Sequence, residues 1–316
     1  MMRLLQCVLL CHVVLFTKAA LSPHPDIAQS DEATCVLLAN KKVECFGVEN
    51  DFLLGVEGTQ IRDSFQVVPY IEDAVQITAG RRHFCVLQGS GRVICWGQND
   101  WHQTGQPDTN PHGPKIVPTE IVFKNVWAFG DETCASRLND GILYCWGKRY
   151  GSPTEHPYDM FYPSQVMRHA TIVDGDDALS CGIDGDTNVF CWDEHTLWDF
   201  KMNFAISLSC KNSRCVAVSG SGKLYVWGDH TNTLGDYYRE PTVFDSFTLY
   251  RAVVLHNDGF CVSTLLGSLA CFNGNTTSMS IVDVPRDINV RAIPANMMNN
   301  RLCFVSEAER VNRLVH

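Results

Sequence analysis

Short apolar runs separated by turn residues recur along this chain of 316 residues. The clearest example begins at Cys85, where Val86-Leu87 and Arg92-Val93-Ile94 flank the turn Gly89-Ser90-Gly91. Two β-prone runs around a glycine-rich three-residue loop are typical of a β-hairpin. If the turn is centred on its middle residue, Cys85 faces Cys95 across the hairpin.

The same unit occurs seven times: a cysteine, a hairpin-like stretch and then a second cysteine followed by an aromatic residue. In the copy at Cys215, Val226 replaces the second cysteine, and the copy at Cys303 lacks both the second cysteine and the aromatic residue. Self-similarity at a spacing of 34–50 residues predicts a repeat architecture. The seven copies begin at Cys35, Cys85, Cys134, Cys181, Cys215, Cys261 and Cys303.

The opposed cysteines predict five disulfides, one inside each complete hairpin. Directly opposed residues have Cα atoms about 4.5–5.5 Å apart, a distance that a disulfide accepts. Zinc is the alternative, but its cysteine ligands usually come as Cys-x2–4-Cys pairs, so the wider spacing favours disulfides. The Cys134 unit has one residue more, which we expect a bulge or a different turn to absorb. The expected pairs are Cys35–Cys45, Cys85–Cys95, Cys134–Cys145, Cys181–Cys191 and Cys261–Cys271.

Between the hairpins the chain reads as two further short strands, for example 64–68 with 74–77, and 115–117 with 122–128. A hairpin with two more strands forms a four-stranded unit, and units of about 40–50 residues with this content are β-propeller blades. The fold class is therefore all-β. Seven hairpins predict seven blades, but only six full segments lie between them and the segment 193–211 is short. Either one blade is incomplete or residues 21–34 supply a closing strand, and six blades is the alternative. The repeated tryptophans are predicted to form the core between blades: Trp96, Trp146, Trp192 and Trp227.

The second unit follows the pattern G-x-x-H-x-C-x-L, then G-x-V-x-C-W-G-x-N, then Q-x-G. It does so with Gly80, His83, Cys85, Leu87, Gly91, Val93, Cys95, Trp96, Gly97, Asn99, Gln103 and Gly105. The pattern resembles the repeat of the regulator of chromosome condensation superfamily, with the best match in the second unit and the poorest in the seventh. The resemblance implies a propeller, most often seven-bladed. The cysteine-paired version is similar to secreted members and to the ectodomains of Crinkly-type plant receptor kinases.

Residues 1–19 read as a secretory signal, because Arg3 precedes an apolar run over 4–16 and small residues follow at Thr17 and Ala19. The alternative, an uncleaved anchor, is disfavoured because the run is shorter than the roughly 20 residues of a spanning helix. We therefore expect a single propeller domain over 20–316, secreted, with no membrane insertion of the mature chain. Secretion also agrees with the many cysteines.

Charge argues against nucleic acid as a partner. Removing residues 1–19 removes Arg3 and Lys18 and no acids, which leaves 23 basic against 35 acidic side chains and a net charge of −12. Nucleic acid rewards a basic face. The chromatin and small-GTPase roles of the founding family are nuclear or cytosolic, so the predicted signal also disfavours them, and a shared fold does not transfer function.

Three cysteines remain after the signal and the five pairs are counted. Cys210 lies five residues before Cys215, and we expect these two to form a tight bridge, with two buried free thiols as the alternative. Cys303 is then odd, and it is either buried or paired with another chain in a disulfide-linked dimer.

Catalytic motifs are not found: the chain has no Gly-x-Ser-x-Gly, no His-Glu-x-x-His, no Walker loop and no dinucleotide fingerprint. His83 lies on the repeat pattern and is expected to make a structural hydrogen bond. Asp184-x-Asp186-x-Asn188 resembles the start of a calcium loop, but Val189 and His195 stand where glycine and glutamate belong, and a hairpin turn explains the acids. We predict no cofactor, no metal and no enzyme activity.

Aromatic residues follow the repeated tryptophans by a few positions and are candidates for a binding face. Equivalent repeat positions emerge on one face of a propeller, and aromatic and Arg side chains are common anchors of binding surfaces. The alternative is that they pack the loops. The candidates are Phe52, Trp101, His102, Arg149, Tyr150, Trp198, Tyr237 and Tyr238.

These observations predict a secreted glycoprotein that binds an extracellular protein or surface glycan through one loop face. Asn275-Thr276-Thr277 is a glycosylation sequon, with Asn275 as the acceptor. The alternative is a structural component of an extracellular matrix or coat, linked through Cys303. An enzyme with a site in the central channel, or an enzyme inhibitor as in a secreted relative that inhibits β-lactamase, is the less favoured hypothesis.

Overall fold

The computed structural model describes residues 27–148 without interruption and a series of segments beyond them. These segments are 169–176, 179–193, 197–200, 202, 204–228, 238–245, 249–256, 259–264, 269–273, 279–281, 290–292, 301–306 and 311–315. Every regular element among the described residues is a β-strand, which confirms the all-β class.

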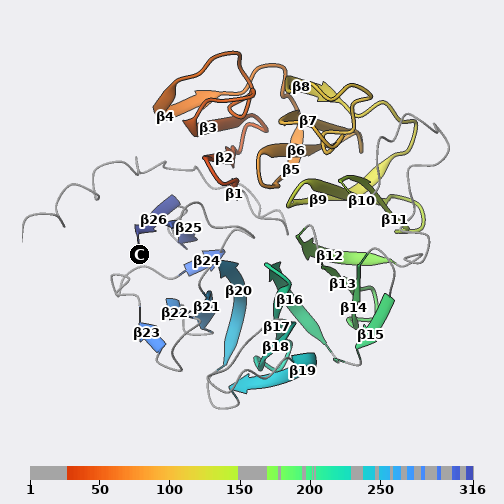
Figure 1. Cartoon of the computed structure of the whole chain (residues 1–316), viewed down its shortest axis with the longest axis vertical. Coiled ribbons are helices and arrows are strands. Elements are labelled where there is room, and N and C mark those ends of the chain that lie inside the picture. Colours follow the sequence, from red (N-terminus) through yellow and green to blue (C-terminus); the bar gives the residue numbers. More distant parts are fainter. Residues whose placement is uncertain are drawn as a thin grey trace, which may run out of the picture.

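The strands form seven antiparallel sheets arranged around a centre, in the manner of a β-propeller (Figure 1). Each sheet follows the chain from its innermost strand outwards. The first two sheets are β1 (Ile27–Gln29), β2 (Ala33–Leu37), β3 (Val43–Val48) and β4 (Ile61–Val67), then β5 (Ala74–Ala79), β6 (His83–Gln88), β7 (Val93–Gly97) and β8 (His112–Ile116). The third has β9 (Phe123–Phe129), β10 (Glu132–Arg137) and β11 (Leu143–Gly147), and the fourth has β12 (Ala170–Gly175), β13 (Ser180–Asp184), β14 (Val189–Trp192) and β15 (Leu197–Phe200).

The fifth sheet consists of β16 (Ala205–Lys211), β17 (Arg214–Ser219), β18 (Leu224–Gly228) and β19 (Tyr238–Asp245). The sixth consists of β20 (Tyr250–His256), β21 (Gly259–Thr264), β22 (Leu269–Asn273) and β23 (Met279–Ile281), and the seventh of β24 (Val290–Ala292), β25 (Arg301–Ser306) and β26 (Val311–Val315). The segment 193–211 is long enough for the outermost strand β15 and the innermost strand β16. Residues 27–29 form the innermost strand of the first sheet.

The hairpins have the predicted register, with Cys85 opposite Cys95 and the equivalent cysteines opposite each other in the other four complete units. The N–H of Gln88 donates to the carbonyl of Arg92 at 2.9 Å, so the turn spans three residues. Its third residue, Gly91, has a φ of +79°, and a Cβ there would meet the carbonyl oxygen of Phe123 at 2.9 Å. The turn therefore needs glycine for both conformation and space.

The extra residue of the Cys134 unit enters the turn rather than a bulge between the hairpin strands. The N–H of Arg137 donates to the carbonyl of Ile142, and the N–H of Gly141 donates to the carbonyl of Arg137, both at 2.8 Å. The turn closed by the Arg137–Ile142 hydrogen bond thus has four residues, 138–141, and Cys134 still pairs with Cys145.

All six expected cysteine pairs are joined in the structure, including Cys210–Cys215. Their Cα atoms are 3.9–4.1 Å apart, closer than the 4.5–5.5 Å expected for opposed residues. Counting from the Gln88–Arg92 hydrogen bond, Cys85 and Cys95 occupy a non-hydrogen-bonded position, where antiparallel strands approach most closely. The disulfides lie at the positions where the strands are already close.

The core consists of apolar clusters between successive sheets. The four repeated tryptophans are no more than 2% exposed. Trp96 packs with residues of the first sheet, and its Nε1–H donates to the carbonyl of Leu53 at 3.2 Å. Trp146 packs on the second sheet and donates in the same way to the carbonyl of Gln103 at 3.1 Å. Trp227 packs with the fourth sheet, which confirms that the tryptophans belong to the core between sheets.

Side chains of the innermost strands also connect neighbouring sheets. Thr78 Oγ1 accepts the N–H of Ala128 at 2.9 Å, and Ser209 Oγ accepts the N–H of Leu255 at 3.0 Å. Gln76 both accepts the N–H of Val126 and donates to its carbonyl. Each of these bonds joins one innermost strand to the next, so the polar contacts around the centre hold the ring together.

Removing one hairpin disulfide should weaken the whole domain. In the chain-entropy model a bridge that closes a loop of this length contributes about 2–3 kcal/mol. We expect Cys85→Ala/Cys95→Ala to lower the free energy of unfolding by that amount, measured from the urea midpoint and slope. The Cys134–Cys145 bridge closes a loop of nearly equal length, so Cys134→Ala/Cys145→Ala should lower the free energy of unfolding by the same amount. An unchanged midpoint in both double variants would contradict the stabilising role.

Candidate binding face

The strand directions define two ends of the propeller. The loop face carries the links between the first and second strands of each sheet, such as 80–82, and the segments that follow the third strands, such as 98–111. The turn face carries the hairpin turns and the links that lead into the innermost strands. Because β6 begins at His83 and ends at Gln88, these two faces lie at opposite ends of the strands.

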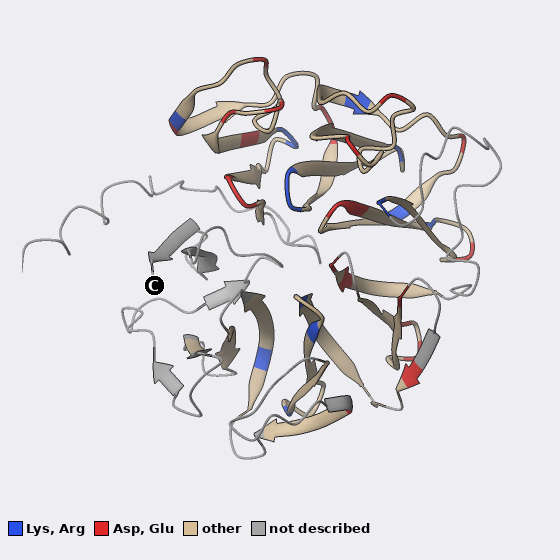
Figure 2. Ribbon diagram, in the orientation of Figure 1, with Lys and Arg blue, Asp and Glu red and all other residues tan. Residues whose placement is uncertain are grey.

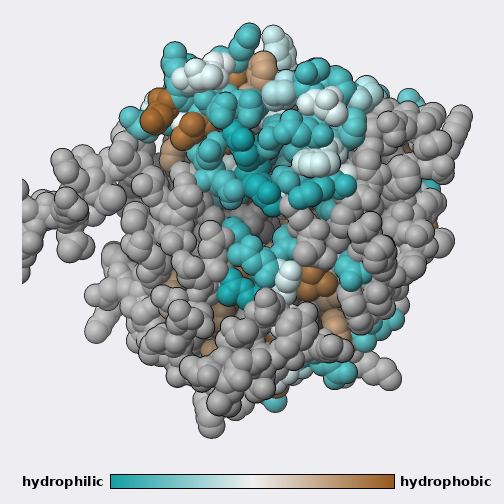
Figure 3. Space-filling view, in the orientation of Figure 1, coloured by the Kyte–Doolittle hydropathy of each residue, from teal (hydrophilic) through white to brown (hydrophobic). Residues whose placement is uncertain are grey.

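The links of the loop face are hydrogen-bonded from sheet to sheet. The N–H of Asp31 donates to the carbonyl of Arg81 at 2.9 Å, and the N–H of Arg81 donates to the carbonyl of Gly130 at 2.7 Å. Further around the ring, the N–H of Ser213 donates to Asp176 Oδ2 at 2.7 Å. Figure 2 shows charged residues on several of the links that face the centre of the ring. Figure 3 shows hydrophilic side chains around the hollow at that centre.

Arg82, in the link before β6 of the second sheet, forms ion pairs with two loops of the first sheet. Its guanidinium lies 3.2 Å from Asp51 Oδ2 and 3.5 Å from Glu32 Oε2. Asp51 belongs to the segment that also contains Phe52, one of the predicted binding residues. Phe52 is half-buried and has a φ of +61°, so its backbone is held in the left-handed region.

Asp131, in the link between β9 and β10 of the third sheet, lies close to two basic side chains. Its buried carboxylate lies 3.4 Å from Arg81 Nη1 and 4.0 Å from Lys148 Nζ. The Lys148 ammonium also lies 5.7 Å from the ring centroid of Trp101, within reach of a cation–π contact. Asp131 therefore positions the charge that covers one side of Trp101.

Trp101 is the best-placed of the predicted aromatic residues. It is 49% exposed, and its N–H donates to Gln103 Oε1 at 2.9 Å. The neighbouring His102 is half-buried, with Nδ1 3.0 Å from the carbonyl oxygen of Gln106. A half-exposed ring on an ordered loop is the form of a recognition anchor rather than of a packed core residue.

Asn99 organises the loop that carries Trp101. Its buried side chain accepts from the N–H of Thr104 at 3.0 Å and from the Thr104 hydroxyl at 2.6 Å, and it donates to the carbonyl of Gln106 at 3.4 Å. Thr104 Oγ1 in turn lies 2.7 Å from His112 Nε2. The repeat pattern contains Asn99, Gln103 and Gly105, but the pattern alone did not indicate that they build the platform of the candidate site.

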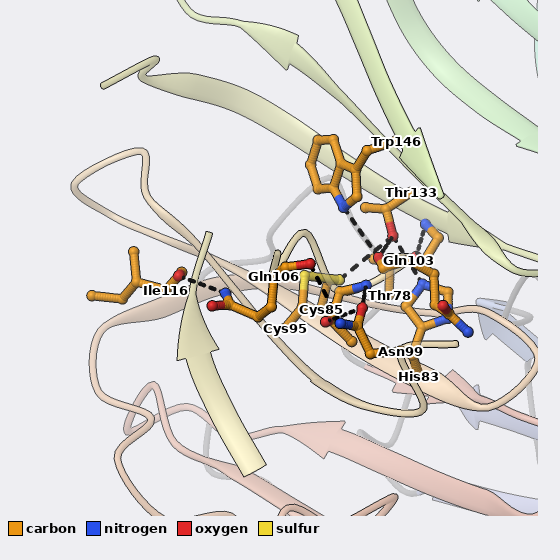
Figure 4. The surroundings of a disulfide bond; sticks show 12 residues. Thr78, His83, Cys85, Cys95, Asn99, Gln103, Gln106, Ile116, Thr133 and Trp146 are labelled. Atoms are coloured by element: carbon orange, nitrogen blue, oxygen red, sulfur yellow. Dashed lines mark hydrogen bonds between the residues drawn. A yellow bond between two sulfur atoms is a disulfide. The ribbon is translucent and has the colours of Figure 1, made fainter. Parts of the chain in front are cut away.

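His83 has the structural role expected of it (Figure 4). Thr133 Oγ1 donates to the carbonyl of Gln103 at 2.8 Å, so it accepts the Nε2–H of His83, also at 2.8 Å. Burial lowers the pKa of His83 to about 3, and the ring stays neutral. Because the unfolded ring binds protons below its ordinary value of 6.5, this histidine costs stability as the pH falls from 6.5 towards 3.

Glu49 stands in the first sheet where Asn99 stands in the second, two residues after the glycine of each unit. Its Oε2 accepts the N–H of Leu54 at 2.9 Å, the same five-residue step as Asn99 to Thr104, but Oε1 is buried and has no hydrogen-bond partner. Burial raises the pKa of Glu49 to about 7, although the N–H of Leu54 and the charge of Arg62 lower it. A carboxyl group that titrates near neutrality therefore supports the loop that carries Phe52.

Several predicted residues lie elsewhere. The structure places Trp198 in the outermost strand β15, opposite Cys191, rather than in a loop, because the short fourth unit needs this segment as its last strand. Tyr238 begins β19 and pairs with Gly228 at the loop end of the fifth sheet. Cys303 lies in β25 opposite Arg313. The residues Arg149, Tyr150, Tyr237 and Asn275 lie outside the described part of the chain.

The calcium-like sequence is a turn. Asp184 Oδ1 accepts the N–H of Asp186 at 2.9 Å and that of Asn188 at 2.8 Å, so its carboxylate is used to close the hairpin. Within the described segments, one cluster of three potential metal ligands is present, formed by Cys181, Cys210 and Cys215. All three are in disulfides and offer no thiolate to a metal.

The fold and this face define a disulfide-pinned β-propeller with an ordered loop surface. A family model, the regulator of chromosome condensation (RCC1) repeat, matches residues 74–103. Human E3 ubiquitin-protein ligase HERC2 is 25% identical over 250 residues, covering 66% of this chain but only 5% of the ligase. The chain thus spans about a twentieth of the length of this relative.

Solved structures share the fold at low sequence identity. Prp20p from Saccharomyces cerevisiae aligns with a TM-score of 0.69 and 14% identity over 92% of this chain and 82% of that chain. The ectodomain of the Physcomitrella patens receptor kinase CR4 aligns with a TM-score of 0.60 and 18% identity over 89% of this chain and 70% of that chain. Residues 74–103 thus resemble an RCC1 repeat, and the likeness to these solved structures shows the β-propeller fold. No helix in the described segments is long and apolar enough to cross a bilayer.

Glu49 should make stability depend on pH with an unusual sign. Its folded pKa lies above the ordinary value of 4.5, so the native state binds more protons and loses stability as the pH rises from 4.5 through about 7. The wild type should lose free energy of unfolding between pH 5 and pH 8, and we expect Glu49→Gln to make that decrease smaller by roughly 1–3 kcal/mol. Urea unfolding at both pH values measures it.

Glu57→Gln is the matched control, because Glu57 is an exposed glutamate of the same loop. It should unfold with the pH dependence of the wild type. Equal pH dependence in Glu49→Gln and the wild type would show that Glu49 is not protonated in the native state.

Proposed function

We propose that this protein is a secreted, non-enzymatic binding module that recognises an extracellular protein through the loop face. The observation that carries the proposal is Trp101, half-exposed on a loop whose buried Asn99, Gln103 and Thr104 hold it in place. Six disulfides and the predicted signal over 1–19 support an extracellular location.

Electrostatics favour a partner that carries positive charge. On the loops of the first three sheets, the basic residues Arg81, Arg82 and Lys148 are each in an ion pair with an acid. On the same loops acidic residues are more numerous: Asp31, Glu32, Asp51, Asp100 and Asp131. The face is therefore suited to a basic protein segment with an apolar group beside Trp101, and it disfavours an anionic glycan.

Relatives agree with recognition by proteins. Prp20p has binding properties towards Gsp1p and histones, and CR4 is a receptor kinase whose ectodomain has this fold. The similarity to HERC2 covers a small part of that ligase, so it supports the repeat fold here and not ligase activity. Recognition without catalysis also fits three carboxylates of the face, because Asp51 and Asp131 pair with cations and Asp176 accepts a backbone N–H.

The test is capture of extracellular protein by residues 20–316 as bait. Trp101→Ala should reduce partner binding at least about fivefold, because an aromatic anchor contributes about 1–3 kcal/mol, and higher salt should weaken the wild-type interaction. Tyr70→Ala is the matched control: Tyr70 is an 86% exposed aromatic residue in the link between β4 and β5, on the turn face. A partner lost with Tyr70→Ala and kept with Trp101→Ala would move the site to the opposite face.

A further inference from the structure

Two separate disulfides touch between the fourth and fifth sheets. Cys181 is bonded to Cys191 in the fourth sheet, and Cys215 is bonded to Cys210 in the fifth. The Sγ atoms of Cys181 and Cys215 are not bonded to each other, yet they lie only 3.4 Å apart. The Sγ atom of Cys210 also lies within 4.8 Å of both.

The contact arises from the altered fifth hairpin. In the structure Val216 and Val226 occupy the two cysteine places of this hairpin, and Cys215 lies one position earlier, opposite Trp227. Cys215 therefore has no cysteine opposite it on β18 and pairs inwards with Cys210 on β16. The equivalent contact between the second and third sheets joins Cys85 Sγ to a hydroxyl, Thr133 Oγ1, at 3.8 Å. A sulfur atom therefore replaces an oxygen as the neighbour of the first hairpin cysteine. The other described innermost strands carry no cysteine at the position of Cys210, where they have Gln29, Ala79, Ala128, Gly175 and Leu255.

The Cys210–Cys215 bridge lies close to the loop face. A two-residue turn, Asn212-Ser213, follows Cys210 after a single residue, and both turn residues have positive φ values of 53° and 58°. Asn212 is exposed, while the sulfur atoms below it are buried with apolar residues of both sheets. A small thiol that opens this turn meets the Cys210–Cys215 bridge before it reaches Cys181–Cys191.

We propose that these two disulfides form an exchange pair in which Cys215 can transfer its bond from Cys210 to Cys181. An external thiolate attacks Cys210 Sγ, forms a mixed disulfide with it and releases the thiolate of Cys215. That thiolate attacks Cys181 Sγ, forms a Cys181–Cys215 disulfide and releases the thiolate of Cys191. The number of disulfides is conserved, and no oxidant is required. The product joins β13 to β17, so it links two sheets covalently, whereas each of the six native disulfides lies within one sheet.

The first test is Cys191→Ser in the full chain, without added thiol. The variant frees the thiolate of Cys181 beside Cys215, and exchange then yields Cys181–Cys215 and a free Cys210. The sample is quenched in acid, alkylated with N-ethylmaleimide and mapped without reduction. We expect loss of the label on Cys181 and its gain on Cys210. Label on Cys181 with an intact Cys210–Cys215 bridge overturns the proposal.

Cys95→Ser is the matched control. It frees Cys85, whose neighbour in the next sheet is the Thr133 hydroxyl, so the label should stay on Cys85 and the other five disulfides should be unchanged. Circular dichroism and tryptophan fluorescence establish that each variant is folded.

The wild-type protein provides a second test that does not depend on folding of a variant. Folded protein is treated with increasing reduced glutathione, quenched and mapped, with cleavage at Lys211 and Arg214 to separate Cys210 from Cys215 and before Asp184 or Asp186 to separate Cys181 from Cys191. We expect glutathione on Cys210, a Cys181–Cys215 link and a free Cys191 while the other four disulfides are intact. Modification of Cys210 and Cys215 with Cys181–Cys191 intact, or simultaneous loss of all six disulfides, overturns the proposal.

Discussion

Packing of each sheet against its neighbour is the interaction on which the rest of this protein depends. A sheet of three or four short strands cannot bury both of its faces alone, so its apolar residues require the next sheet. In four of the sheets a tryptophan of the third strand supplies much of that contact, and the hydrogen bonds from Trp96 and Trp146 to loop carbonyls fix the direction of these two rings as well as their position. Losing one of these rings would expose two sheets, not one.

The glycine that follows three of the four repeated tryptophans reflects the same close packing. Gly97 has a φ of +103°, and a Cβ there would lie 2.6 Å from the carbonyl oxygen of Arg82 and 2.9 Å from Cα of His83. The chain must leave the third strand directly over the start of the second, and only glycine allows both the conformation and the approach. The segment that follows this third strand on the loop face therefore begins from a fixed point.

On this base the loop face carries ionisable groups whose pKa values are shifted by burial. Asn99 holds its loop by neutral hydrogen bonds, whereas Glu49 performs the same task with a carboxyl group that burial drives towards the protonated form. His83 has the opposite effect on the pH dependence of stability, because burial lowers its pKa and keeps the ring unprotonated. Asp174 is a further case on the innermost strand β12, where burial raises its pKa to about 7 although the N–H of Cys210 donates to it at 2.9 Å. Stability and the shape of the face are thus linked to pH through groups that belong to the repeat framework.

The amino-acid sequence by itself determined the local structure. The hairpin register, the five hairpin disulfides and the Cys210–Cys215 bridge could all be predicted, because they depend on residues at most eleven positions apart and on the two-residue period of a strand. The core role of Trp96 and the hydrogen bond of His83 also followed from the repeat pattern. Only the tertiary structure decided which units meet: Asp131 between Arg81 and Lys148, Trp198 in a strand, and Cys181 against Cys215. These contacts cross between sheets or depend on how a short unit is completed, and the angle at which one sheet packs on the next is set by the whole ring rather than by any local pattern.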